Sequence, residues 1–421
     1  MRGAEILGGD RRRELVRRHH LGGDAGSPET VTRALVALHA TDPASVYLSV
    51  LARSAMATLA DVSSAMYERR SLVRWMAMRR TLFVFPREDV PMVQAAVGTP
   101  LAAALRRQLI SRLERNGSEP PIDGDLGAWV AGLEQRVEQA LTRRGTASGA
   151  QLRSDEPALA TLIPPRAPSD RAQYVTTALL TLLSADGRLV RGAAAGPWTS
   201  RHHRWEPVSR WWPGGLPAVD PARARRELAR RWLARYGPAT VDDLQWWTGW
   251  TKTTTRTALS AIPVEEVDLH GETGITLAGS GSGSGSGDPG AGGGGHAVDE
   301  PVAALLPALD PTPMGWKHRD WFLGVDPAQV FDRAGNIGPT LWWNGEITGS
   351  WAITAGGEVR TAMVADRGAE ADDAVRQAAA ALHQRLDGTV VTPPSARRSN
   401  DHSQPPDRRL PGTAAGRASA V

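Results

Sequence analysis

The stretch that decides the fold runs from residue 27 to residue 85 and reads SPETVTRALVALHATDPASVYLSVLARSAMATLADVSSAMYERRSLVRWMAMRRTLFVF. It opens with a helix start: Ser27 is a hydroxyl cap, Pro28 suits the first helical position, and Glu29 lies at the positive end of the helix dipole. Apolar side chains then recur at helical spacing up to the run His39-Ala40-Thr41-Asp42. The pattern therefore predicts a helix from Pro28 to about residue 42.

A second helix is predicted from residue 58 to about residue 69, because a threonine cap is followed three residues later by an acid. Two short strands, 72–73 and 82–84, come next, and the turn between them carries Arg79 and Arg80. Helices followed by a two-stranded ribbon with arginines at its tip are the plan of a winged helix. Such a unit places one helix in the major groove of DNA and its ribbon against the sugar-phosphate backbone.

The same order, helices and then a ribbon, recurs twice more along the chain. The third copy is the clearest, with helices predicted at 221–236, 241–248 and 252–262, and strands at 264–268 and 274–278. After a Gly/Ser stretch, alternating apolar residues with Asn-Gly and Gly-Gly turns indicate hairpins. The predicted fold class is mainly α with α+β modules: three tandem winged-helix units plus a C-terminal small β-barrel or β-sheet domain.

The chain is too long for a single core, so several domains are expected. A stretch such as SGSGSGSGDPGAGGGG has no core-forming residue and marks a linker. The predicted parts are a first winged helix with flanking helices at 1–120, a second at 121–215, a third at 216–279, a Gly/Ser linker at 280–298, a β-domain with a closing helix at 299–391, and a disordered tail at 392–421.

Four sequence runs carry a resemblance to a known family. They read LHATDPASVYL, ERRSLVRWMAMRRTL, ARYGPATVDDLQWWTGW and LLPALDPTPMGWKHRDWFLG, and they occur in family order. The chain resembles the AlkZ/YcaQ-type bacterial DNA glycosylases over about residues 10 to 390. The resemblance implies tandem winged helices, a C-terminal β-barrel, and removal of a damaged base from duplex DNA.

In that family, two polar side chains with one residue between them, usually Gln and Gln or Gln and Asp, position the attacking water. The matching positions here are His39 and Thr41. Histidine can accept a proton from water near neutral pH, and Thr41 can orient that water. Asp42 lies three residues from His39, so on a helix the two would share a face, and we take His39, Thr41 and Asp42 as the candidate catalytic residues. The alternative is a decayed site in which His39 only ends a helix.

The ribbon of the first unit departs from the family as well. Where the family usually has Arg-Gly-Thr-Leu-His, this chain has Arg79-Arg80-Thr81-Leu82-Phe83. Phe83 replaces a polar group that would face the site, and Arg80 adds a charge where glycine permits close approach. We expect contact with phosphate to survive these changes, whereas the positioning of an extruded base is weakened.

Forty-nine residues are basic, and all but Lys252 and Lys317 are arginine. A GC-rich genome explains an arginine excess; phosphate recognition by the guanidinium fork also explains it. Clustering within ribbon-sized segments favours DNA contact. For Lys317 and Arg319 the alternative is a structural salt bridge from Asp310 or Asp320. The residues predicted to contact DNA are Arg79, Arg80, Arg188, Arg191, Arg204, Lys252, Arg256, Lys317 and Arg319.

Other site types find little support in the sequence. There is no cysteine, which excludes disulfides and thiolate metal sites, and the adjacent His202 and His203 cannot easily converge on a metal ion. Trp246, Trp247 and Trp250 have the helical spacing of core residues, although a tryptophan can also stack on unpaired bases. No metal, cofactor or membrane segment is expected.

The expected partner is double-stranded DNA, and the expected form is a cytoplasmic, nucleoid-associated monomer. If the protein is an enzyme, it is a monofunctional glycosylase acting on alkylated purines. A non-catalytic DNA-binding protein, such as a dimeric regulator on paired half-sites, is the alternative.

Overall fold

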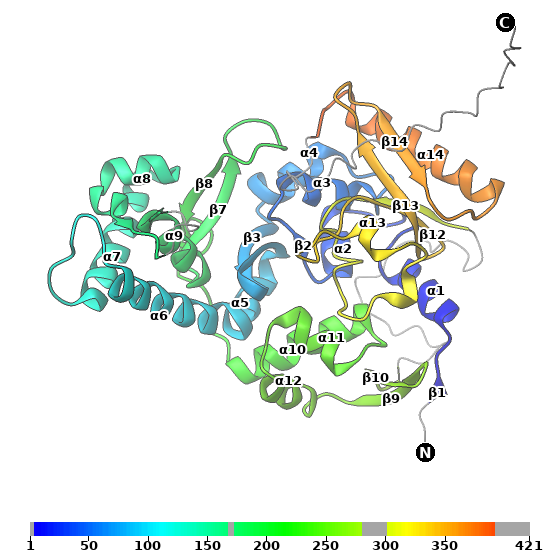
Figure 1. The fold of residues 1–421 in the computed structure, drawn as a ribbon, viewed down its shortest axis with the longest axis horizontal. Coiled ribbons are helices and arrows are strands. Elements are labelled where there is room, and N and C mark those ends of the chain that lie inside the picture. The colour runs from blue at the N-terminus through cyan, green and yellow to red at the C-terminus, as the bar shows by residue number, and fades with distance from the viewer. Residues whose placement is uncertain (1–3, 167–171, 280–300, 392–421) are drawn as a thin grey trace, which may run out of the picture.

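The computed structural model describes residues 4–166, 172–279 and 301–391. The predicted linker at 280–298 and the predicted tail at 392–421 therefore lie outside the described residues. Helices and small sheets are mixed throughout, and they gather in four groups that follow chain order from blue through teal and green to orange (Figure 1). Among the described residues, no helix is both long enough and apolar enough to cross a membrane.

The first group corrects the predicted course of the chain before His39. Helix α2, Pro28–Ala34, begins as predicted, with the Ser27 hydroxyl accepting a hydrogen bond from a backbone N–H of the first turn. It ends at Ala34, and Val36 has a left-handed backbone with φ of 60°. Leu38–His39 is strand β2, paired antiparallel with β4, Thr81–Pro86. The predicted helix to residue 42 is wrong, because the backbone groups of this segment are satisfied by a sheet partner more than 40 residues away.

The central sheet has the order β2-β4-β3, with β3 at Leu72–Ala77. The β3–β4 turn, Met78–Arg80, holds Arg79 and Arg80 in left-handed conformations with φ of 53° and 59°. The hairpin predicted from the sequence is therefore present, and its strands are longer than predicted. The other elements of this group are α1 (Gly8–Arg18), α3 (Pro43–Leu51), α4 (Leu59–Ser63) and a π-helical turn (Ser64–Glu68).

The second group has helices drawn from cyan to teal in Figure 1 and a two-stranded ribbon, β7 and β8, drawn in green. Its ribbon, β7 and β8, packs against β3 of the central sheet. The elements of this group are α5 (Val90–Val93), a π-helical turn (Gln94–Gly98), α6 (Thr99–Asn116), α7 (Leu126–Arg144), α8 (Gly149–Asp155), β5 (Leu162–Ile163), β6 (Gln173–Tyr174), α9 (Val175–Ala185), β7 (Leu189–Ala194) and β8 (His203–Pro207).

The third group has α10 at Pro221–Tyr236 and α11 at Val241–Thr248, with the bounds that the sequence predicts. Helix α12 (Lys252–Leu259) and the antiparallel pair β9 (Val264–Leu269) and β10 (Glu272–Leu277) follow. Strand β1, Ala4–Glu5, pairs in parallel with β9. The start of the chain thus completes a sheet more than 250 residues away, which the sequence did not predict.

The C-terminal group is an antiparallel sheet in the order β11-β12-β13-β14, with β11 and β14 at its edges. Asn344 and Gly345 form the β12–β13 turn with φ of 49° and 80°, the left-handed pair that a tight hairpin requires, so the predicted Asn-Gly turn is confirmed. Helix α14 covers the sheet. The elements are β11 (Ala303–Leu306), α13 (Pro327–Val330), β12 (Thr340–Trp343), β13 (Glu346–Ile353), β14 (Val359–Met363) and α14 (Ala369–Leu386).

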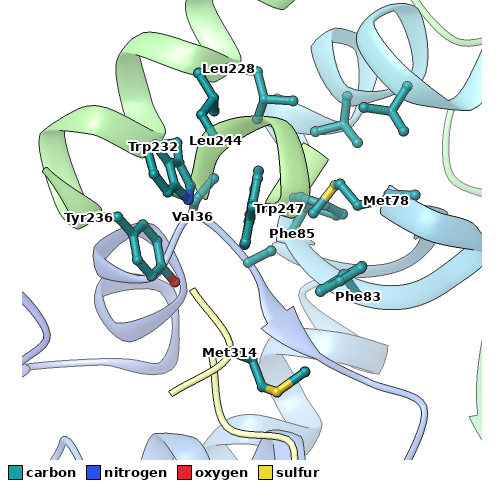
Figure 2. Packing of buried hydrophobic residues seen from close by; sticks show 14 of the residues in the cluster. Val36, Met78, Phe83, Phe85, Leu228, Trp232, Tyr236, Leu244, Trp247 and Met314 are labelled. Carbon is teal, nitrogen blue, oxygen red and sulfur yellow. The ribbon is translucent and has the colours of Figure 1, made fainter. Parts of the chain in front are cut away.

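One hydrophobic cluster joins residues from all four groups (Figure 2), and three further clusters lie beside it, one of them mostly within the second group. The cluster includes Phe83 and Phe85 of β4, Trp232 of α10 and Trp247 of α11, together with Met314 of the segment before β12. The largest buried aromatic side chains are therefore shared between sequence-distant elements, so these groups stabilise one another.

A fully buried ion pair fixes the geometry where the groups meet. The Arg53 guanidinium donates to both carboxylate oxygens of Asp310, with Nη2–Oδ1 at 2.6 Å and Nη1–Oδ2 at 2.8 Å, and both side chains have 0% exposure. Ser49 donates to the same carboxylate, and Arg53 also donates to Thr312. Asp310 therefore does form a structural salt bridge, with Arg53 and not with Lys317 or Arg319.

The network continues to the first helix through His19, which is fully buried. Its Nε2 lies 3.1 Å from the carbonyl of Arg235 and its Nδ1 lies 2.9 Å from the hydroxyl of Thr312. Burial, followed by the nearby Arg53 charge, holds the His19 pKa well below its usual range, so the ring is neutral. A neutral ring with its proton on Nε2 donates to the carbonyl and accepts from Thr312.

Replacing Asp310 by alanine should lower the free energy of unfolding by about 3–5 kcal/mol, because it leaves the Arg53 charge buried without a counter-ion. Denaturant titration measures this loss. The matched control is Asp373→Ala, which removes an exposed ion pair to Arg376 and should cost at most about 1 kcal/mol. Equal losses in the two variants would contradict the role given to the buried pair.

Candidate active site

The His39–Asp42 segment divides its side chains between two faces. Strand β2 pairs His39 with Phe83, and the N–H of Ala40 extends the ladder to the carbonyl of Leu82. His39 is half-buried and Thr41 is exposed, whereas Ala40 and Asp42 are buried. In extended backbone, residues two apart share a face. His39 and Thr41 therefore form the outward pair, and the expectation that His39 and Asp42 share a helix face is wrong.

His39 lies in a partly dry, positively charged setting. Its ring meets Phe83 edge-on at a centroid distance of 5.3 Å, and its Nδ1 is buried without a hydrogen-bond partner among the described residues. Burial, with the Arg79 charge as a second cause, lowers the His39 pKa to about 4. The imidazole is consequently neutral at physiological pH and can accept a hydrogen bond.

Arg79 and Arg319 meet over one tryptophan. The guanidinium carbon of Arg79 lies 4.0 Å from the ring centroid of Trp246, and that of Arg319 lies 4.9 Å from the same centroid and 4.5 Å from that of Phe331. Burial, followed by the Arg79 charge, lowers the Arg319 pKa to about 10. The structure thus brings two predicted DNA contacts together over Trp246, and one of them, Arg79, lies close enough to His39 to affect its charge. The sequence had left Trp246 open between a core and a stacking role.

Asp42 lies on the opposite face of the segment and has partners of its own. Its Oδ1 is 3.6 Å from Nε of Arg201, which belongs to the loop between β7 and β8. Burial raises the Asp42 pKa, and the charges of Arg201 and Arg74 oppose that shift. Arg74 of β3 donates from Nη2 to the carbonyl of Ala40 at 3.0 Å, so it braces the backbone between His39 and Thr41.

The remaining predicted DNA contacts are dispersed. Arg80 of the hairpin turn is exposed, as are Lys252 and Arg256 on α12. Lys317 is exposed, and its Nζ lies 3.4 Å from the carboxylate of Asp242. These positions can reach an external strand, but they do not gather beside His39.

The second ribbon contributes arginines of different kinds. The Arg188 guanidinium donates from Nη1 to Glu134 at 2.6 Å and from Nη2 to Glu138 at 2.5 Å. These two carboxylates compensate its charge within the fold, so Arg188 is not among the DNA contacts proposed below. Arg204 reaches Gln151 at 3.4 Å. Arg191 lies over the ring of Trp205 at 4.3 Å.

The sequence did not predict that Arg201 would pair with Asp42. It also did not predict that Arg74 would donate a hydrogen bond to the carbonyl of Ala40. Both arginines lie in clusters that the sequence marked as basic, but nothing local distinguishes an arginine that holds a backbone carbonyl from one that faces solvent. Among the described residues, no group of three or more His, Asp or Glu side chains is placed to hold a metal ion.

Comparison with known proteins now places the chain in a class. It belongs to a family of DNA glycosylases: the sequence model of the family described as "DNA glycosylase AlkZ-like" matches residues 32–385. Among solved structures, Streptomyces sahachiroi DNA glycosylase AlkZ shares the fold with a TM-score of 0.68 and 18% sequence identity, over 92% of this chain and 99% of that chain. No curated protein matches the chain. The resemblance drawn from the four sequence runs is confirmed.

The His39 ring should titrate with a midpoint near pH 4, since burial and Arg79 both disfavour the charged form. NMR of the histidine ring resonances measures this, with His39→Gln used to assign the signal. A midpoint near 6.5 would show that the ring is solvated and would contradict the described environment.

Proposed function

We propose that the protein is a monofunctional DNA glycosylase that hydrolyses the N-glycosidic bond of alkylated purines in duplex DNA. The observation that carries the proposal is the outward pair of His39 and Thr41 together with Arg79, whose charge acts on His39 and which shares the Trp246 ring with Arg319. This segment lies within the part of the chain that matches the family. The neutral imidazole of His39 and the hydroxyl of Thr41 share one face of it, and the nearby guanidinium of Arg79 can contact a DNA phosphate.

We further infer an architecture of three winged-helix units, with a small β-domain after them. The helix-then-ribbon order supports it: α2–α4 precede β3 and β4, α7–α9 precede β7 and β8, and α10–α12 precede β9 and β10. The proposed units correspond to 1–120, 121–215 and 216–279, with the β-domain at 299–391. The proposed working form is a monomer on double-stranded DNA at the nucleoid.

The chemistry follows from the two side chains. A water molecule held between them donates a hydrogen bond to the neutral imidazole of His39, while Thr41 fixes its orientation. The water oxygen attacks C1′ of the deoxyribose as the C1′–N9 bond breaks. The base departs with the bonding electrons, and the proton of the water passes to His39 and then to solvent.

A weak base is sufficient for this substrate class. Alkylation at N7 or N3 gives the purine a positive charge, so the base leaves as a neutral molecule and needs no general acid. Extrusion of the base from the stack costs a few kcal/mol, which is least for a damaged base. The low His39 pKa is thus compatible with hydrolysis of an activated glycosidic bond, and much less so with an undamaged nucleotide.

Replacing His39 by alanine should slow release of an N7-alkylated purine from duplex DNA by about 10²-fold or more, because the water loses its base. Thr41→Val should slow it by up to about tenfold, the effect of one hydrogen bond. Single-turnover base release measures both rates.

The matched control for the histidine is His383→Ala, an exposed position on α14. It should release the base at the wild-type rate. If His39→Ala and wild type release the base equally, hydrolysis does not depend on this pair, and a non-catalytic DNA-binding role replaces it.

We expect Arg79→Gln and Arg319→Gln each to weaken the salt dependence of DNA binding. The slope of the logarithm of the binding constant against the logarithm of the salt concentration should become shallower by about 0.9 in each variant, the effect of losing one phosphate contact. Fluorescence anisotropy with a labelled duplex over a range of salt concentrations gives the slope. Arg376→Gln on α14 removes a charge of the same kind from an exposed ion pair and should leave the slope unchanged. Unchanged slopes for both Arg79 and Arg319 would remove these two residues from the DNA interface.

A further inference from the structure

We call residues 39–42 the motif segment, and its inner face is the one opposite to the side chains of His39 and Thr41. A second cationic group lies on this inner face, where β3 packs against β7. We name it the Arg74–Arg191 site; it consists of Arg74 on β3, Arg191 on β7 and His203 on β8, with Asp42 and Arg201 at its edge. These residues come from three separate stretches of sequence. None of the proposed steps of base release uses Arg74, Arg191 or His203.

Arg74 is a buried cation with unused donors. Its side chain is 3% exposed, and one nitrogen, Nη2, bonds the carbonyl of Ala40. Its Nε and Nη1 are buried without a partner among the described residues. A buried guanidinium with free donors is costly unless an anion or water supplies acceptors.

Arg191 stands next to it in a similar state. It is half-buried, lies 4.3 Å above the ring centroid of Trp205, and has a buried Nε without a partner among the described residues. Burial, followed by the charge of Arg74, lowers the Arg191 pKa to about 9. The same two arginine charges, after burial, help to lower the pKa of His203 to about 4, so His203 adds no charge but can donate or accept as a neutral ring.

Asp42 interacts with both Arg74 and Arg201, and no carboxylate partner of Arg191 is found in the described part of the chain. Asp42 is the carboxylate at the edge of the site, and the Nε of Arg201 already lies 3.6 Å from it. Arg188, three residues before Arg191, is different, because it donates hydrogen bonds to Glu134 and Glu138. Arg188 thus has carboxylate partners within the fold, and Arg191 has none among the described residues.

We propose that the Arg74–Arg191 site binds a phosphodiester group of the DNA strand that carries the target nucleotide, with Arg191 in direct contact and Arg74 supplying charge from behind. Arg74 bonds the carbonyl that lies between His39 and Thr41, so a phosphate here lies across the segment from the proposed reacting position. With Arg79 and Arg319 on the outer face, the motif segment is then flanked by cations on both sides. The inference rests on the proposed function, since that supplies the DNA strand.

The first test is DNA binding by Arg191→Gln over a range of salt concentrations. Loss of one phosphate contact should make the salt slope shallower by about 0.9. Arg191→Lys keeps the charge and should retain most of the slope, and Arg376→Gln on α14 should match wild type. Thermal unfolding of each variant confirms that it is folded. A wild-type slope in Arg191→Gln would overturn the proposal.

The second test uses inorganic phosphate as the probe and needs no DNA. At matched ionic strength, phosphate in place of chloride should raise the melting temperature of wild type more than that of Arg191→Gln. Equal shifts in the two proteins would overturn the site. A phosphate effect that depends on Arg191, combined with an unchanged DNA slope, would overturn the phosphodiester assignment in favour of a free phosphate.

The two tests also separate this inference from the proposed function. Failure of wild type to release alkylated bases, with the Arg191-dependent salt slope intact, would remove the enzyme activity and support the site as part of a DNA-binding surface. Failure of wild type to bind DNA at all would overturn the phosphodiester assignment together with the proposed function.

Discussion

The buried ion pair between Arg53 and Asp310 is the constraint on which the rest of the structure depends. It joins residues 257 positions apart, and Ser49 and Thr312 complete its hydrogen bonds. Through Thr312 the same network reaches His19 and the end of α10. A charge pair with no exposure tolerates little displacement, because any shift leaves a charge without a partner in a medium of low polarity. The segment that contains Asp310 is thereby held against the end of α3.

Charge compensation distinguishes Arg53 and Arg188 from the candidates for DNA contact. Arg53 and Arg188 have carboxylates at hydrogen-bonding distance, so their charges are neutralised within the fold. Arg79, Arg319 and Arg191 instead lie over aromatic rings, which support a cation without neutralising it. An uncompensated guanidinium held in place loses little entropy when it meets a phosphate. A net charge of only +4 for the whole chain is thus compatible with local surfaces that suit DNA.

The candidate active-site segment begins in strand β2 and not in a helix, and this changes which of its side chains share a face. One intervening residue puts two side chains on opposite sides of a helix but on the same side of a strand. His39 and Thr41 therefore form the outward pair, while Asp42 turns to Arg201 on the other face. Arg74 holds the carbonyl between them.

The sequence alone determined the elements whose signals are local. The caps around α10 and α11 predicted both helices with their observed bounds, the Asn344-Gly345 turn predicted a hairpin, and four sequence runs indicated the family. Tertiary structure decided the rest: that Leu38–His39 is a strand, that β1 joins β9, and which arginines are paired. The physical reason is that a cap or a tight turn is satisfied within a few residues. The partner of a strand or of a buried charge lies tens or hundreds of residues away, and only folding brings it near.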